Sequence, residues 1–174
     1  MLHNMPDDAF DIIQKIHVRA PFRLIRQAAP YFRIKVLVIL SFIQIINIPL
    51  QSENHENRSI VNVSSTTGLH GNVGQANYAV AKSSVIGLTK TIAKEWGPFG
   101  VRANTIAFGL IHTRLTASKE AGETIDIDGK KVALGVPGPQ RPILDATKQN
   151  SDAYPLIPLR RGGSTDEAAS AVLL

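Results

Sequence analysis

The sequence contains no cysteine, which excludes disulfide bonds and thiolate metal sites. Its five histidines do not fall at the H-x-x-x-H or H-E-x-x-H spacings that place two metal ligands on one face of a helix. We therefore expect no metal centre in this chain.

We also expect no membrane-spanning segment. The longest apolar run, Ile34 to Leu50, is shorter than the roughly 20 residues that a membrane helix needs, and it contains Gln44, Asn47 and Pro49. Its β-branched residues favour a buried or aggregation-prone strand, with a membrane-surface role as the alternative. The N-terminus shows no secretory signal and the final residues, AVLL, are no peroxisomal tripeptide. We expect a cytoplasmic protein, leaving mitochondrial and peroxisomal locations open.

Length and charge narrow the class of protein further. The 174 residues suffice for at most one ordinary domain, and 44% hydrophobic residues are typical of a soluble protein with a core. The net charge is +5, and many of the basic residues lie near the start: Arg19, Arg23, Arg26, Arg33 and Lys35. Because stacking aromatics are not interleaved with them, they indicate a solvated helix face, and we expect no nucleic-acid partner.

Hydrophobic spacing predicts a first helix from about Asp7 to Tyr31. Pro21 lies inside it and has no N–H, so the carbonyl of His17 loses its helical partner and the helix should kink. A second helix is expected from about Ala76 to Trp96, because Gly97-Pro98 stops it.

Two short apolar segments, Ile60–Val63 and Val101–Ala107, are predicted to be parallel strands. Asp128-Gly129 lies between alternating residues and indicates a hairpin. Ser164 and Glu167 stand three residues apart, which is the spacing of a capping box that opens a last helix.

The chemistry-bearing residues lie around the predicted second helix. Tyr78 and Lys82 are four residues apart, so they share one face of it. A phenol beside an ammonium ionises more readily and can exchange a proton with a carbonyl or alcohol oxygen. The hydroxyl of Ser65, before the Gly-rich loop, could hydrogen-bond the same oxygen. A lone Y-x-x-x-K is weak evidence, since such spacings are common on structural helices.

The wider context is more specific. The stretch from Val63 to Lys82, VSSTTGLHGNVGQANYAVAK, resembles the active-site segment of the short-chain dehydrogenase/reductase family, especially its 3-oxoacyl-carrier-protein-reductase-like members. The segments GLTKT from Gly87 and GVRANTI from Gly100 look like the same family. The resemblance puts that family's catalytic Ser, Tyr and Lys at Ser65, Tyr78 and Lys82.

The resemblance implies further roles. It places His17 where the family has a catalytic Asn whose main-chain carbonyl holds a relay water, and a histidine without a role is the alternative. It implies that NADP or NAD binds through Tyr78, Lys82 and a loop containing Gly109, Ile111 and Thr113, although a helix cap is another interpretation of Thr113. It also implies a small carbonyl or alcohol substrate and a homo-oligomer formed through the two long helices.

The expected fold class is α/β: a partial Rossmann-like, doubly wound parallel sheet, truncated at both ends. The family's Gly-rich nucleotide-binding turn and its final strand have no counterpart in the sequence. We expect residues 1–174 to form a single partial domain, with an insertion at 34–57 and a substrate lid, or a passive surface insertion, within 117–160. A non-catalytic homologue that serves as an oligomer partner, or an unstable product, is the alternative to an active oxidoreductase.

Overall fold

A computed structural model describes residues 1–33, 58–116, 124–127, 129–133 and 155–173. The chain divides into two compact units, Met1–Ala107 and Phe108–Leu174. The predicted insertion at 34–57 lies outside the described residues, as does most of the predicted lid, so both stay predictions. Within the described part, no helix is long and apolar enough to cross a membrane.

The first unit begins with the predicted long helix. A 3-10 turn, η1 (Leu2–Asn4), precedes α1 (Asp7–Gln14), a π-helical turn η2 (Lys15–Arg19) and α2 (Ala20–Phe32). The irregularity expected from Pro21 is therefore a π-helical turn just before it, in which the Ala20 N–H donates to the Lys15 carbonyl. The missing N–H of Pro21 disfavours regular pairing in this turn, which is why the helix changes its hydrogen-bond pattern there.

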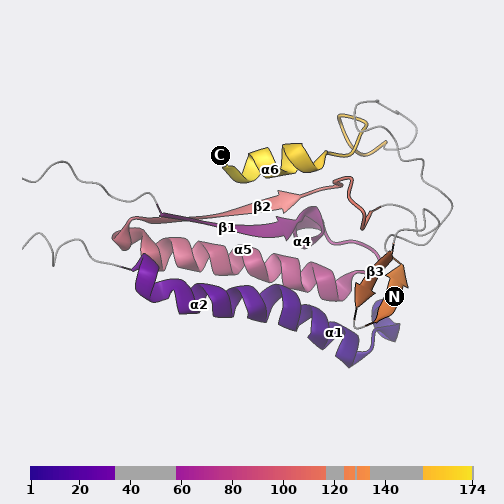
Figure 1. Ribbon diagram of the computed structural model, residues 1–174, viewed down its shortest axis with the longest axis horizontal. Coiled ribbons are helices and arrows are strands. Elements are labelled where there is room, and N and C mark those ends of the chain that lie inside the picture. Colours follow the sequence, from indigo (N-terminus) through magenta and orange to yellow (C-terminus); the bar gives the residue numbers. More distant parts are fainter. Residues whose placement is uncertain (34–57, 117–123, 128, 134–154, 174) are drawn as a thin grey trace, which may run out of the picture. The chain divides into compact units, whose positions relative to one another are not determined.

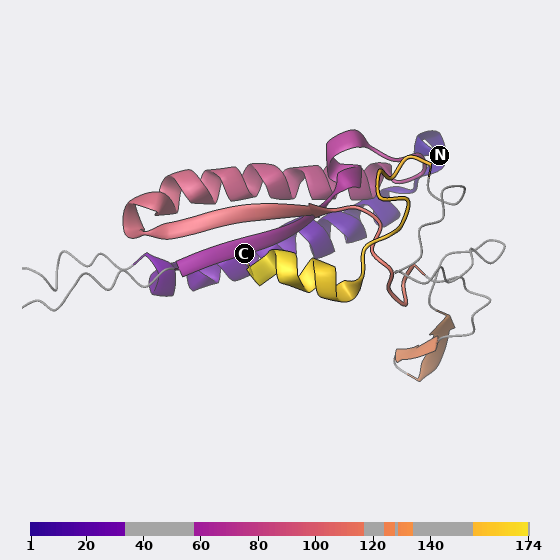
Figure 2. The same ribbon diagram turned by 90° about the horizontal axis from the view of Figure 1, so that it is seen from above.

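The predicted strands and second helix follow in the expected order. The elements are β1 (Arg58–Ser65), α4 (Thr66–His70), α5 (Ala76–Trp96), the 3-10 turn η3 (Gly97–Phe99) and β2 (Val101–Phe108). The strands β1 and β2 form a two-stranded sheet and point in the same direction (Figures 1 and 2). Gly100 adopts a φ of 75° between η3 and β2, a conformation that glycine adopts without steric cost.

The helix α5 packs against both β1 and α1 (Figure 1). The buried core lies at its C-terminal end, where Ile92, Trp96 and Val101 cluster. The ring of Phe32 from α2 lies 6.1 Å from the ring of Trp96, centroid to centroid. The core thus holds one end of α5, and the opposite end carries Tyr78.

The second unit contains the predicted hairpin. The strands β3 (Thr124–Ile127) and β4 (Lys130–Ala133) pair antiparallel. Gly129 has a φ of 77°, and its N–H donates to the Asp126 carboxylate over 2.8 Å. Gly129 thus lies in the turn that the sequence predicts, whereas Asp128 lies outside the described residues.

The last helix, α6 (Thr165–Leu173), begins with the predicted capping box. The Glu167 N–H donates to the Ser164 hydroxyl over 3.1 Å, and the Ser164 N–H donates to the Glu167 carboxylate over 2.8 Å. Two guanidinium nitrogens of Arg161 donate to the same carboxylate over 2.9 and 2.6 Å. These bonds satisfy N–H groups in the first turn that have no partner inside the helix.

Candidate active site

Tyr78 and Lys82 lie one turn apart on α5, as their spacing predicts. The Lys82 Nζ lies 5.6 Å from the centroid of the Tyr78 ring. Tyr78 is half-buried, and Lys82 is buried with 9% of its surface exposed. The Lys82 ammonium and the Tyr78 ring thus lie on the same face of α5.

Two hydrogen bonds hold Lys82 against the end of β1. Its Nζ donates to the Val63 carbonyl over 3.0 Å, and its own carbonyl accepts from the Ser64 hydroxyl over 2.7 Å. Burial lowers the pKa of the Lys82 ammonium below its ordinary value, because desolvation penalises the charged form. The amine therefore loses its proton more easily than an exposed lysine.

Ser65 ends β1 and caps the short helix α4, which stands where the sequence predicts part of the Gly-rich loop. Its hydroxyl accepts from the Thr67 N–H over 3.2 Å. The residue follows Val63 and Ser64, which hold Lys82, so the chain places this hydroxyl beside the strand end that holds the lysine. Its contact with a substrate stays a prediction.

His17 lies against Tyr78 from the π-helical turn. The two rings are 5.4 Å apart, centroid to centroid, and meet edge to face at 86°. Burial, and secondly the charge of Lys82, lower the pKa of the His17 imidazole, because both disfavour its protonated form. The structure thus brings His17, Tyr78 and Lys82 together, while the relay role of the His17 carbonyl stays a prediction.

The other predicted cofactor residues lie in the second unit. Ile111 forms a parallel bridge with Gly163, in which His112 N–H donates to the Gly163 carbonyl over 2.8 Å. The Thr116 hydroxyl accepts from the Thr113 N–H over 2.8 Å and lies 3.0 Å from the carbonyl oxygens of Ile111 and Thr113. Thr113 thus begins a turn, and Gly109 is exposed just after β2. The role of this loop in cofactor binding stays a prediction.

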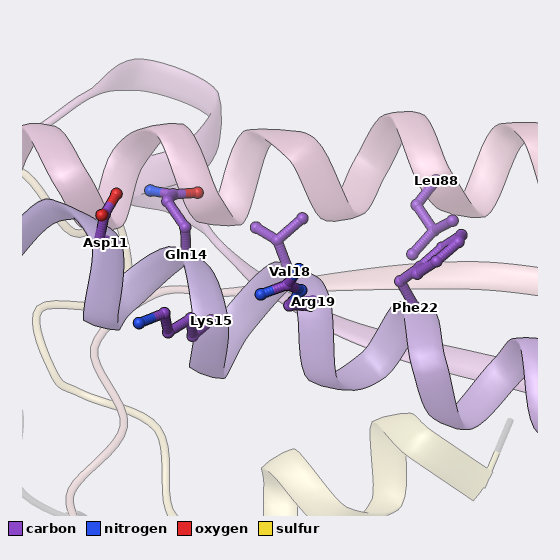
Figure 3. A pocket seen from close by; sticks show the side chains of 7 residues that line it. All are labelled: Asp11, Gln14, Lys15, Val18, Arg19, Phe22 and Leu88. Carbon is purple, nitrogen blue, oxygen red and sulfur yellow. The ribbon is translucent and has the colours of Figure 1, made fainter.

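A separate groove of about 500 Å³ runs between the first helix and α5 (Figure 3). Seven residues line it: Asp11, Gln14, Lys15, Val18, Arg19, Phe22 and Leu88. None of them is a predicted site residue. In the described ranges, no three histidine or carboxylate side chains gather to hold a metal ion.

Sequence reasoning missed several residues that build this arrangement. Ser64 and Val63 hold Lys82, and Gly68 lets α4 approach α5 so closely that an added Cβ would stand 2.7 Å from the Lys82 carbonyl carbon. Asn77 links the start of α5 to α1. Two signals could have indicated the first three residues. A buried hydroxyl in an alternating strand points to Ser64 and its neighbour Val63, and a glycine inside a short helix points to Gly68.

Comparison with known proteins identifies the family. The family model described as enoyl-(acyl carrier protein) reductase matches residues 36–148. The 3-oxoacyl-acyl-carrier-protein reductase FabG of Thermotoga maritima is 35% identical over 173 residues, which cover 99% of this chain and 52% of that protein. The chain belongs to the short-chain dehydrogenase/reductase family. This short-chain dehydrogenase/reductase chain spans about half the length of that relative.

Two further similarities agree with this membership. The human (3R)-3-hydroxyacyl-CoA dehydrogenase is 41% identical over 87 residues, covering 50% of this chain and 33% of that protein. A solved structure, 4-hydroxyisoleucine dehydrogenase complexed with NADH and succinate, is 30% identical and has a TM-score of 0.51, with 66% of this chain and 41% of that chain covered. The predictions of a partial α/β Rossmann-like fold and of membership in the short-chain dehydrogenase/reductase family are confirmed.

Proposed function

We propose that this chain carries the proton-transfer half of an NAD(P)-dependent oxidoreductase that reduces a carbonyl or oxidises an alcohol. The observation that carries the proposal is the pair on α5, where the Lys82 Nζ lies 5.6 Å from the Tyr78 ring centroid and 3.0 Å from the Val63 carbonyl oxygen. A positioned phenol with a neighbouring cation is a proton donor and acceptor suited to a substrate oxygen.

In the reduction direction, the Tyr78 hydroxyl gives its proton to the carbonyl oxygen, which becomes an alcohol. Lys82 stabilises the phenolate that remains, since its ammonium lies on the same helix face. The Ser65 hydroxyl donates a hydrogen bond to the same substrate oxygen and orients it. Bound NAD(P)H supplies the hydride that adds to the carbonyl carbon, and NAD(P)⁺ accepts one in the reverse direction.

The residues present fit one end of the cofactor. An ammonium carries three donors, and the structure gives one of the Lys82 donors to Val63, so this side chain suits the hydroxyls of a ribose. The loop of Gly109, Ile111 and Thr113 would contact the nicotinamide carboxamide. The sequence has no strand followed by G-x-G-x-x-G and a helix, the arrangement that binds the pyrophosphate. We therefore expect weak cofactor binding by this chain.

The substrate class is inferred from the relatives. Their names specify 3-oxoacyl-acyl-carrier-protein and (3R)-3-hydroxyacyl-CoA, and both describe an acyl thioester with an oxygen on its third carbon. We propose a 3-oxoacyl thioester or a similar carbonyl compound for this chain. The net charge of +5 would attract the anionic carrier groups to which such thioesters are attached.

The test begins with a fluorescence titration of the purified, folded chain with NADPH and NADH, followed by turnover of a 3-oxoacyl thioester. We expect Tyr78→Phe to lower kcat by about 100-fold or more, because the proton donor is removed while the ring remains. Tyr31→Phe is the matched control, since Tyr31 is 75% exposed on α2. Equal turnover by Tyr78→Phe and the native chain would refute the assignment.

A second candidate is a non-catalytic homologue acting as an oligomer partner, or an unstable product; the lack of a strand followed by G-x-G-x-x-G and a helix in this sequence supports it. Measurable turnover that Tyr78→Phe removes would exclude it. Cofactor binding without turnover would support it.

We also propose a homo-oligomer formed through the first helix and α5. Apolar side chains on the first helix are exposed in the single chain, with Ile12 at 55%, Ile16 at 54% and Leu24 at 67%. Light scattering of the purified chain should give a mass above the 18.9 kDa of one copy.

We propose a cytoplasmic location, with mitochondria and peroxisomes as alternatives that cell fractionation distinguishes.

A further inference from the structure

Asn77, the residue before Tyr78, links the start of α5 to α1 through three hydrogen bonds. Its side-chain oxygen accepts from the Tyr78 N–H over 2.8 Å, and its side-chain nitrogen donates to the Ala9 carbonyl over 3.0 Å. Its main-chain carbonyl accepts from the Gln14 side-chain amide over 2.9 Å. We call Asn77, Ala9 and Gln14 the Asn77 clasp.

All three bonds are partly buried, and two of them cross between helices that are more than sixty residues apart in sequence. Gln14 points from α1 toward α5 in Figure 3. Because partly buried bonds are shielded from competing water, the clasp restricts both sliding and rotation of α1 against the first turn of α5.

The clasp has a direct connection with the site. Gln14 bonds to Asn77 and His17 meets Tyr78, so both side chains face the start of α5. The face that binds the carbonyl of Asn77 therefore also presents the imidazole that meets the Tyr78 ring at 5.4 Å. A change in the position of α1 would move His17 away from Tyr78 and Lys82.

An ordinary helix cap does not account for these contacts. The N-cap of α5 is Gln75, which makes no side-chain capping bond, and Asn77 serves the N–H of the next residue instead. A local cap needs only the side-chain oxygen of Asn77. The bond from its nitrogen to Ala9 and the bond from Gln14 serve the docking of α1.

We propose that Asn77 is a positioning residue for Tyr78: its side chain holds the phenol-bearing turn of α5 in register with α1 and with His17. Its effect on catalysis rests on the proposed function, whereas its effect on the geometry does not. Among the described residues, the Tyr78 ring contacts the His17 ring and the charge of Lys82 lowers the pKa of its imidazole, and both residues belong to α5.

The test follows the ionisation of His17 by NMR in the full chain, assigned with a His17→Gln variant. In the native protein its midpoint should lie below the ordinary value of 6.5, because the ring is partly desolvated near Lys82. Asn77→Ala and Gln14→Ala should each move this midpoint upward, since a released α1 lets the ring return to water. The matched controls are Thr91→Ala on α5 and Gln27→Ala on α2, both exposed positions away from the clasp.

A purely structural role would lower the unfolding temperature and leave the His17 midpoint of the folded protein unchanged, which would overturn the proposal. If one variant fails to fold, the other still decides, because each removes a different bond of the clasp. In the turnover assay Asn77→Ala should lower kcat by about 10- to 100-fold with little change in KM for the cofactor. A shifted midpoint in a chain without native turnover would uphold the clasp and count against the proposed function.

Discussion

Replacing Gly68 with alanine should separate α4 from α5 at Lys82. A Cβ at this position would stand 2.7 Å from the Lys82 carbonyl carbon, 2.8 Å from the Ser83 nitrogen and 2.9 Å from the Lys82 Cβ. Two of these atoms are backbone and cannot rotate away. Since carbon atoms prefer separations of about 3.5–4.0 Å, α4 must move by roughly 1 Å.

The size of the effect follows from two opposing terms. Overpacking of this kind costs about 1–3 kcal/mol. Alanine inside a helix recovers about 0.5–1 kcal/mol relative to glycine, so the net destabilisation should be about 0–2.5 kcal/mol, with a centre near 1 kcal/mol. For a chain of this length that corresponds to a fall in Tm of up to about 10 °C.

Gly87→Ala is the matched control, because Gly87 lies inside α5 and a Cβ there meets nothing within 4 Å. The control should gain about 0.5–1 kcal/mol, since only the helix-propensity term operates. Thermal unfolding followed by circular dichroism, at low protein concentration, compares the two variants. Equal stability of the Gly68→Ala and Gly87→Ala variants would show that α4 does not approach Lys82 as closely as described.

Two further predictions concern single side chains. Thr89→Val should destabilise the protein by about 1–3 kcal/mol in urea unfolding, because the buried Asn62 amide, which donates to the Thr89 hydroxyl over 2.8 Å, loses its acceptor; an unchanged midpoint would contradict this bond. The hydrogen bonds from Arg161, and then from the Ser164 N–H, lower the pKa of Glu167 from 4.5 to about 2. Its contribution to the α6 cap should therefore be complete above pH 4.5 and disappear as the pH falls through about 2. An NMR titration of Glu167 with an ordinary midpoint would show that the capping box is open.

Local signals predicted most of the elements. The helix expected over Ala76–Trp96 is found with the same bounds, because Gly97-Pro98 stops it at a defined residue. The strand ends were less accurate: Ile60–Val63 extends to Arg58–Ser65, since polar side chains at strand ends carry little periodic signal. The short helix α4 was missed because its glycine was interpreted as a loop residue, whereas the glycine is needed for contact with α5.

The sequence predicted which types of residue form the candidate site, but not the contacts between residues from different helices. The spacing of Tyr78 and Lys82 places both on one helix face, and the structure agrees. The contact between His17 and Tyr78 joins residues from two helices, so no local pattern could indicate it without the family resemblance. The π-helical turn before Pro21 is a similar case, because a proline predicts an irregularity and not its form.

Two hydrogen bonds tie Lys82 to the end of β1. The distance between these site residues therefore does not depend on the length of the chain that connects β1 to α5. Ser64 and Val63 bind the carbonyl and the ammonium of Lys82 directly, so the strand and α5 are held in register by bonds that do not involve residues 71–74. Those residues are exposed, and Val73 is 82% exposed. A longer connection at residues 71–74 should therefore leave the phenol and the amine in place.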